Sequence, residues 1–379
     1  MKVSHKVDRF WFTYFLIRLF YLFFAVLVYA KLTPLGDTDR YMSAGFFFSW
    51  KIFYQSTWLL DFLGGILGGL LGGSNVVSNL PFTVFSFCII KWAIEELNFK
   101  MPAGNNMLLL ILISLPNFCV WTSVCSKEVF GLLFSAILGV LIIRFFNRDY
   151  KIKKKDWLAL YLCLMFKPQY LPAILECLLL IYLFNEYCKN IRSKALLFIF
   201  IIAVNVGGLY LVRDTVNMYA DIMFLNFDNP EASSNRNENI WMKENDFYKE
   251  APLGMLVAFW GPTINEMFSK PTHFLAGLES IIMLVLFIRM AKQPLIRLVF
   301  DGKYNATIIP TYWILFTGIC FMHYPFGIFN SGSAIRYRTN FIFLFIILLM
   351  YIHFHYQKNI LFDIANNEEN INYWRLLLP

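Results

Sequence analysis

The sequence predicts an all-α, polytopic membrane protein with about ten transmembrane helices. Its 379 residues are 58% hydrophobic and 19% aromatic, and only 15% are charged, which is too little polar surface for a soluble chain of this length. The charged residues lie almost entirely in the gaps between long apolar runs. When these runs are threaded alternately in and out of a membrane, the unusual charges gather on one side. We therefore expect one integral membrane domain, 1–379, with its chemistry on that side.

The apolar segments are defined by length, because a spanning helix needs about 20 mainly apolar residues. The first, 10–30, follows three basic residues, which place the amino terminus in the cytoplasm. The others are 80–97, 107–122, 129–146, 157–166, 171–184, 195–212, 273–290, 306–322 and 341–355. Alternation returns the carboxyl terminus to the cytoplasm as well. The segments 157–166 and 171–184 are short, so a broken or tilted pair is an alternative there.

The net charge of +8 does not indicate a nucleic-acid partner. Four lysines between positions 151 and 155 lie in one short loop beside apolar segments, where basic residues fix the cytoplasmic side. The positive charge therefore indicates topology, and we expect no nucleic acid as a partner.

Three outer loops are expected, at about 31–79, 213–272 and 323–340. In the first, glycine pairs begin at positions 64, 68 and 72. On a helix this spacing forms one stripe of small residues, which allows close backbone packing. An interfacial segment along the outer leaflet is the alternative for this stretch.

Two carboxylates, Asp37 and Asp39, follow the first segment closely and are the candidate catalytic residues, with Arg40 beside them. A carboxylate at the outer surface can act as a general base on a sugar hydroxyl or help to hold a divalent cation. Alternating spacing favours one base with one structural partner over two equivalent bases. The alternative is a solvated loop with an Asp cap for a following helix.

Two lysines are harder to explain structurally. Glu128 is expected near a helix N-terminus, which the helix dipole favours, but Lys127 would be a cation at the unfavourable end. Lys167 is stranded between two short apolar segments. Ionisable residues at membrane depth indicate function, so we expect these three residues to contact substrate.

Arginines complete the candidate set. Arg336 and Arg338 flank Tyr337 just before the last segment, and all three are candidates for substrate binding. Guanidinium forks match the oxygens of a diphosphate. Interfacial snorkelling is the alternative for both arginines. His323 is expected at the other end of the same outer loop, and Arg213 at the start of the loop 213–272; both join the candidates for substrate binding.

These motifs resemble those of integral membrane glycosyltransferases of the GT-C type, which use polyprenyl-phosphate-linked sugars. The resemblance rests on the acidic motif 36–41, Ser-Lys-Glu at 126–128 and Arg-Tyr-Arg at 336–338, in that order and on one side of the membrane. Within that superfamily the chain looks most like the Wzy-type O-antigen or capsule repeat-unit polymerases. It departs from the paired arginine-rich loops of some of those polymerases.

The resemblance implies a function in the bacterial inner membrane, at its periplasmic face. A glycan would pass from undecaprenyl diphosphate to a lipid-linked acceptor, with Asp37 or Asp39 as the base. Arg336, Arg338 and Lys127, with Lys167 and Arg213, would neutralise the departing diphosphate. The implied partners are this lipid-linked glycan and membrane lipid. No cofactor is required, and a divalent cation and a chain-length regulator protein are left open.

Two other functions compete with the polymerase interpretation. One is a GT-C transferase that adds a single sugar from a polyprenyl monophosphate. The other is a polysaccharide flippase or transporter, whose polar groups should line a path through the bilayer. Only Arg18, Glu176 and Glu279 lie deep in the predicted segments, which favours transfer over transport.

Overall fold

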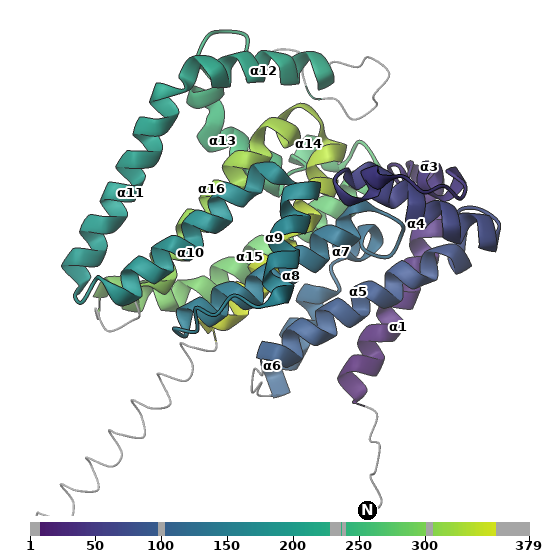
Figure 1. Ribbon diagram of the computed structural model, residues 1–379, viewed down its shortest axis with the longest axis horizontal. Helices are drawn as coiled ribbons and strands as arrows, with labels where there is room; N and C mark the ends of the chain where they lie inside the picture. The colour runs from purple at the N-terminus through teal and green to yellow at the C-terminus, as the bar shows by residue number, and fades with distance from the viewer. Residues whose placement is uncertain (1–7, 98–102, 228–235, 237–239, 301–305, 354–379) are drawn as a thin grey trace, which may run out of the picture.

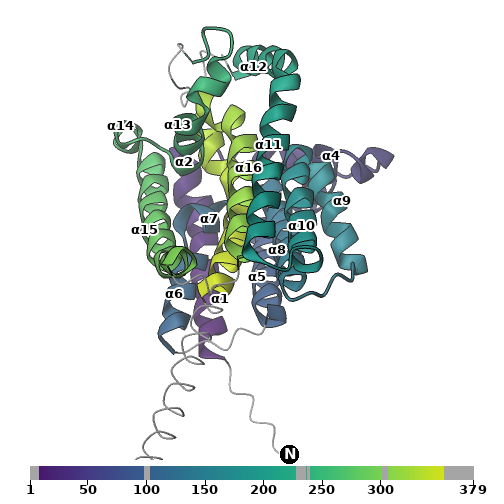
Figure 2. The same cartoon turned by 90° about the vertical axis from the view of Figure 1, so that its left-hand side faces the viewer.

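The computed structural model describes residues 8–97, 103–227, 236, 240–300 and 306–353. Within these ranges the chain forms helices and no β-strand, which confirms the all-α prediction. Figure 1 shows α11 along one side of the bundle, with α12 turned across its end. Figure 2 shows α15 on one side of the bundle and α4 projecting on the other.

The element bounds are as follows: α1 Arg9–Phe24, η1 Ala25–Tyr29, α2 Ala30–Leu32, α3 Thr38–Ser43, η2 Trp50–Phe53, α4 Ser56–Leu71, α5 Val76–Leu97, α6 Ala103–Ile113, α7 Pro116–Trp121, α8 Lys127–Phe146, α9 Lys154–Phe166, η3 Pro168–Tyr170, α10 Leu171–Glu186, α11 Ile191–Leu211, α12 Arg213–Phe227, α13 Asp246–Trp260, α14 Ile264–Met267, α15 Pro271–Phe300 and α16 Ile308–Phe329. A further helix, Ser331–His353, follows α16.

Among the described residues, 8 helices are long and apolar enough to cross a membrane. They are Arg9–Leu32, Val76–Leu97, Lys127–Phe146, Pro168–Glu186, Ile191–Leu211, Pro271–Lys292, Ile308–Phe329 and Ser331–His353. The chain is therefore an all-α, polytopic membrane protein. The two remaining predicted segments fall on shorter helices: 107–122 is divided between α6 and α7, and 157–166 lies on α9.

The expected outer loop 323–340 is helical along almost its whole length. Residues 323–340 continue α16 as far as Phe329 and, after Asn330, begin the next helix at Ser331. The helical path includes Pro325. Proline is tolerated inside membrane helices where neighbouring groups satisfy the freed backbone.

The centre of the bundle is formed by α8 and the helix Ser331–His353, both of which are largely buried. Small residues bring the two helices together: a Cβ at Gly131 would collide with the side chain of Asn340. A Cβ at Gly139 would collide with Ile347. Close backbone approach of this kind is how membrane helices pack without a hydrophobic driving force between them.

Buried charges hold the short helix α7 at both ends. Glu279 Oε2 accepts hydrogen bonds from the backbone N–H groups of Asn117 (2.7 Å) and Phe118 (3.1 Å). At the other end, Arg18 donates to the Oγ1 (2.7 Å) and carbonyl oxygen (2.5 Å) of Thr122. Lipid offers no partner for exposed helix-end groups. Arg18 and Glu279 therefore stabilise the break between α6 and α7.

Candidate functional site

The first wall of the candidate site is the turn that leads into α3. Gly36 has φ +58°, a left-handed conformation that glycine adopts without a steric cost. Asp37 follows it and precedes the helix. Thr38 anchors the turn, because its Oγ1 lies 2.8 Å from Leu35 O and 3.0 Å from Cys125 O. The turn is thus tied to the segment that leads into α8.

The glycine stripe of α4 supports α3 from behind. A Cβ at Gly64 would lie 2.8 Å from backbone atoms of Tyr41. A Cβ at Gly68 would collide with the backbone of Met42 in α3, and a Cβ at Gly65 would collide with the backbone of Gly45, just after α3. Gly72 ends α4 in the left-handed conformation, with φ +78°. Close packing, as predicted for the stripe, is confirmed at the first three of these glycines.

The two candidate carboxylates lie in different surroundings. Asp37 Oδ2 accepts a hydrogen bond from Tyr41 OH at 3.2 Å and lies 3.7 Å from Nη2 of Arg336. Asp39 lies in the first turn of α3 and is exposed. Arg40 is also exposed and bridges Asp37 (3.7 Å) and Asp61 (3.2 Å). Asp37 is therefore the carboxylate that faces inward.

Arg336 connects this wall to α8. Its Nε lies 2.9 Å from Oε1 of Glu128, which is fully buried in the first turn of α8. The guanidinium also lies over the ring of Trp121, 5.2 Å from its centroid. Oε2 of Glu128 is buried and has no hydrogen-bond partner in the described part of the chain. The pair leaves one carboxylate oxygen open to a further partner.

Lys127 and Lys167 complete the group. Lys127 is half-buried and its Nζ donates to Thr57 Oγ1 at 2.8 Å. Lys167 is buried, and its Nζ lies 3.6 Å from the ring centroid of Tyr337. Burial lowers the pKa of Lys167 to about 8. Within the described ranges neither lysine forms an ion pair.

Lys167 owes its place to a helix break. The helix α9 ends at Phe166, and Pro168 begins the short helix η3. A proline disfavours helical backbone in the residue before it, and Lys167 has φ −149° and ψ 60°. We call Asp37, Lys127, Glu128, Lys167 and Arg336 the charged cluster. It holds three cations and two carboxylates.

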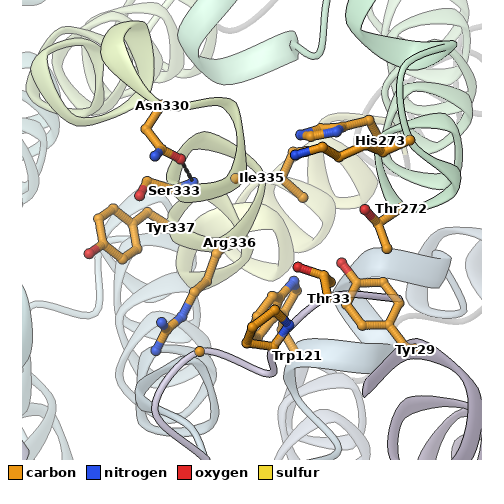
Figure 3. Close-up of a pocket in the computed structure, with 14 residues that line it drawn as sticks. Tyr29, Thr33, Trp121, Thr272, His273, Asn330, Ser333, Ile335, Arg336 and Tyr337 are labelled. Atoms are coloured by element: carbon orange, nitrogen blue, oxygen red, sulfur yellow. Dashed lines mark hydrogen bonds between the residues drawn. The ribbon is translucent and has the colours of Figure 1, made fainter. Parts of the chain in front are cut away.

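A cavity of about 200 Å³ lies beside the charged cluster. Arg336 and Tyr337 belong to its lining, together with Tyr29 and Trp121. Figure 3 shows His273 facing these residues from the other side. The charged cluster therefore borders a space that a small polar group can enter.

Four candidates from the sequence lie elsewhere or are already engaged. Arg338 is fully buried, and it donates to the carbonyl oxygen of Gly261 (2.8 Å) and pairs with Glu279 (3.1 Å). His323 is also fully buried, within α16, and its Nδ1 lies 3.2 Å from Tyr170 OH. Direct contact with a diphosphate, as expected for Arg338, is not compatible with this packing. The expected outer-loop position of His323 is likewise wrong.

Arg213 stands at the corner between α11 and α12. It pairs with Asp214 (3.5 Å) and lies over the ring of Tyr210. Arg40 contacts the charged cluster through Asp37, but its side chain points mainly to Asp61 and solvent. Neither arginine belongs to the centre of the site.

Sequence reasoning missed several residues that shape this region, among them Thr57, Asp61, Trp121 and His273. Thr57 and Asp61 lie in the apolar helix α4, and nothing in the sequence indicated that they would lie near the charged cluster. Trp121 adjoins the Ser-Lys-Glu motif, and that proximity was its only clue. His273 is the first residue of a predicted transmembrane segment, 273–290, and was therefore not considered as a site residue.

In the described part of the chain, no group of three or more His, Cys, Asp or Glu side chains could hold a metal ion. Asp37 and Glu128 are instead bridged by Arg336. A guanidinium thus occupies the position between the two carboxylates.

Comparison with protein-family models, with curated proteins and with solved structures finds no match for this chain.

Proposed function

We propose that the protein transfers a glycan from a lipid-linked phosphate to a lipid-linked acceptor, as in the polymerisation of polysaccharide repeat units. One observation carries this proposal: Lys127 and Lys167 lie near Arg336, and neither forms an ion pair with a carboxylate of the described residues. An uncompensated cation in a membrane protein is costly and indicates function. An anionic substrate would supply the missing charge.

Phosphate fits this group better than other anions, because residues of α10, the helix that follows Lys167 in the chain, line an apolar cavity. The cavity has a volume of about 560 Å³ and lies between α10, α11 and α16. Pro172 and Ala173, just after Lys167 in the chain, are part of its mostly apolar lining. A phosphate at the lysines could therefore carry a long hydrocarbon chain into this cavity. Polyprenyl phosphates and diphosphates combine such a phosphate group with a long hydrocarbon chain.

The chemistry assigned to the charged cluster is a displacement at the anomeric carbon of the donor sugar. The acceptor hydroxyl oxygen forms the new bond to this carbon and gives its proton to Asp37. The bond from the carbon to the phosphate oxygen breaks, and its electron pair leaves with the phosphate. Lys127, Lys167 and Arg336 then stabilise the negative charge that develops there. Asp37 has this role in the proposal because Asp39 is exposed.

The surroundings of the deep charges favour transfer over transport. Glu279 pairs with Arg338, and Arg18 binds Thr122. Glu176 accepts a hydrogen bond from Asn205 at 2.6 Å. Arg18, Glu279 and Arg338 thus stabilise contacts between helices, whereas a carrier needs polar groups that are open to its cargo. Glu176, with Asn205, borders the apolar cavity. Within the same proposal, the fold is of GT-C type and the charged cluster faces the bacterial periplasm.

The test is gel analysis of surface polysaccharide from a deletion strain complemented with wild type, Lys167→Met or Lys249→Met. Lys249 is an exposed lysine on α13 and serves as the matched control. Loss of the ladder with a single repeat unit left, in Lys167→Met only, supports a polymerase. A complete ladder that lacks one sugar would replace the polymerase with a single-sugar transferase. An unchanged ladder would contradict glycosyl transfer.

A further inference from the structure

Lys167 differs from the other cations of the charged cluster in the way that its side chain is held. Lys127 donates to a threonine hydroxyl at 2.8 Å, and Arg336 pairs with Glu128 at 2.9 Å. Within the described ranges, the Nζ of Lys167 forms no hydrogen bond and no ion pair. It lies instead over the ring of Tyr337, 3.6 Å from the ring centroid.

The backbone of Lys167 is fixed independently of its side chain. Its N–H donates to the carbonyl oxygen of Cys163 at 2.8 Å, and its own carbonyl oxygen accepts from the N–H of Tyr170 at 3.2 Å. The ammonium group, however, is carried on a flexible stem of four carbons. A contact at the end of this stem is needed to hold the charge in one place.

The ring of Tyr337 is itself held by two helices. It packs against Phe326 of α16, with the centroids 6.1 Å apart and the ring planes at 74°. The carbonyl oxygen of Tyr337 accepts a hydrogen bond from Nδ2 of Asn340, one turn further along its own helix, at 2.7 Å. Figure 3 shows the ring pointing away from Trp121. The ring is thus a fixed surface on which a cation can rest.

We propose that Tyr337 is a positioning residue, which holds the ammonium group of Lys167 over its ring where an anionic ligand can reach it. The face of an aromatic ring attracts a cation, and the attraction is stronger away from water. The ring carries no net charge, so it stabilises the ammonium group without neutralising it. A carboxylate in the same place would compete with a phosphate. The inference rests on the proposed function and adds how one of its cations is held.

The other charged groups around Lys167 set its pKa together with the ring. Burial lowers this pKa to about 8; Glu128 opposes the shift, and Arg336 and Lys127 add to it. His323 of α16 is also close enough to interact electrostatically. A cation–π contact favours the charged form of the lysine. If the ring is removed and these neighbours stay, the pKa of Lys167 should fall further.

The experiment measures the pKa of Lys167 in the unliganded full chain, in nanodiscs. Formaldehyde with a borane reductant methylates neutral amines, so the rate of methylation at each pH, followed by mass spectrometry of the peptide, gives the midpoint. In Tyr337→Leu the midpoint should lie about one pH unit below wild type, as expected for a cation–π contact away from water. Tyr337→Phe keeps a ring and should keep the wild-type midpoint.

Two further variants separate the ring face from the packing of the side chain. A trifluorinated phenylalanine at position 337 keeps the shape of the ring but withdraws its electrons, so the midpoint should fall relative to Tyr337→Phe. This comparison holds even if Tyr337→Leu does not fold. The control is Tyr210→Leu, which removes a ring under another cation, Arg213, with the guanidinium 4.6 Å from the ring centroid. It should leave the midpoint of Lys167 unchanged.

An unchanged or higher midpoint in both Tyr337→Leu and the fluorinated variant would overturn the proposal. A midpoint that falls in Tyr337→Phe as far as in Tyr337→Leu would also overturn it, because the hydroxyl group would then be responsible. Binding of undecaprenyl phosphate to Lys167→Met, measured separately, tests the proposed function. A normal lipid affinity in that variant would defeat the phosphate site and leave the pKa measurement intact, since that measurement uses no lipid ligand.

Discussion

The guanidinium of Arg336 lies 2.9 Å from the carboxylate of Glu128. These two residues are 208 positions apart in the sequence, and their ion pair joins the helix Ser331–His353 to α8. Arg338, only two residues further on, lies in a different environment. It is fully buried and pairs with Glu279. The two arginines of one short motif thus have separate tasks. Arg336 belongs to the charged cluster, and Arg338 stabilises the bundle.

The two first-loop carboxylates should differ in their effect on activity. Asp37 contacts Arg336 and Tyr41, whereas Asp39 is exposed. A positioned general base contributes about 10²–10⁴-fold to a rate, so Asp37→Asn should lower the rate of glycan transfer by roughly this factor. Asp39→Asn, the matched control, should stay near the wild-type rate. Polysaccharide ladders and initial rates measure both, and a reversed order of the two defects would remove Asp37 as the base.

Gly36 is needed for its conformation and for its lack of a side chain. A Cβ at this position would collide with the guanidinium of Arg336. Gly36→Ala should therefore cost about 1–2 kcal/mol for the left-handed backbone and also displace Arg336. Gly45 is a suitable control, because it has φ +74° but open space around its Cβ position.

Thermal unfolding in detergent and transfer assays compare the two alanine variants. Both variants should lose stability, but only Gly36→Ala should lose activity. Equal activity in the two variants would contradict the role given to the contact with Arg336.

Arg338 should act on stability. Arg338→Met leaves Glu279 as a buried charge without its partner, and breaking such a pair costs about 3–5 kcal/mol. The double variant Arg338→Met/Glu279→Gln removes both charges and should recover much of this loss. The Gln oxygen can still accept from the N–H groups of Asn117 and Phe118, as Glu279 does. A double variant that is stable but inactive would show instead that Arg338 contacts substrate.

Binding of the phosphate should depend on pH through Lys167. Burial lowers its pKa from the ordinary 10.5 to about 8, so the free protein loses this positive charge as the pH rises through 8. Lipid-phosphate affinity should fall above pH 8 in the wild type and stay flat in Lys167→Met. Isothermal titration between about pH 6.5 and 9.5 measures this, on either side of the pKa. Identical pH profiles would exclude Lys167 as the titrating group.

The same shift has the opposite effect on the stability of the unliganded protein. The unfolded chain binds this proton more tightly than the folded chain, because its lysine keeps the ordinary pKa. Stability should therefore rise with pH between about 8 and 10.5 in the wild type. Lys167→Met should lack this contribution.

Much of the fold was accessible from the sequence, because long apolar runs are a strong and local signal. The glycine stripe likewise predicted close backbone packing, and the structure shows that α3 is the partner of α4. The break between α6 and α7 was not accessible. It depends on Glu279 and Arg18, which come from distant helices to satisfy the ends of α7. The run 323–340 was also misjudged: it is the gap between two apolar segments, but the helices on either side extend into it as far as Phe329 and from Ser331.

The candidate site was only partly predictable for a related reason. Sequence position indicated that Asp37, Lys127, Glu128, Lys167 and Arg336 could meet, and the structure brings these five residues together. The sequence could not show that Arg336 belongs to the charged cluster and Arg338 does not, because the surroundings of a side chain on a helix depend on the neighbouring helices. Trp121 and His273 border the cavity through tertiary packing, which no local pattern encodes.

The most direct test of the charged cluster as a lipid-phosphate site is native mass spectrometry of the protein with undecaprenyl phosphate. Wild type, Lys167→Met and Lys249→Met would be titrated in parallel, with inorganic pyrophosphate as a competitor. We predict that Lys167→Met weakens lipid binding by about tenfold or more, as expected for a lost charge-assisted contact, while Lys249→Met binds like wild type. Equal lipid affinity in all three proteins would contradict the assignment of the cluster to phosphate.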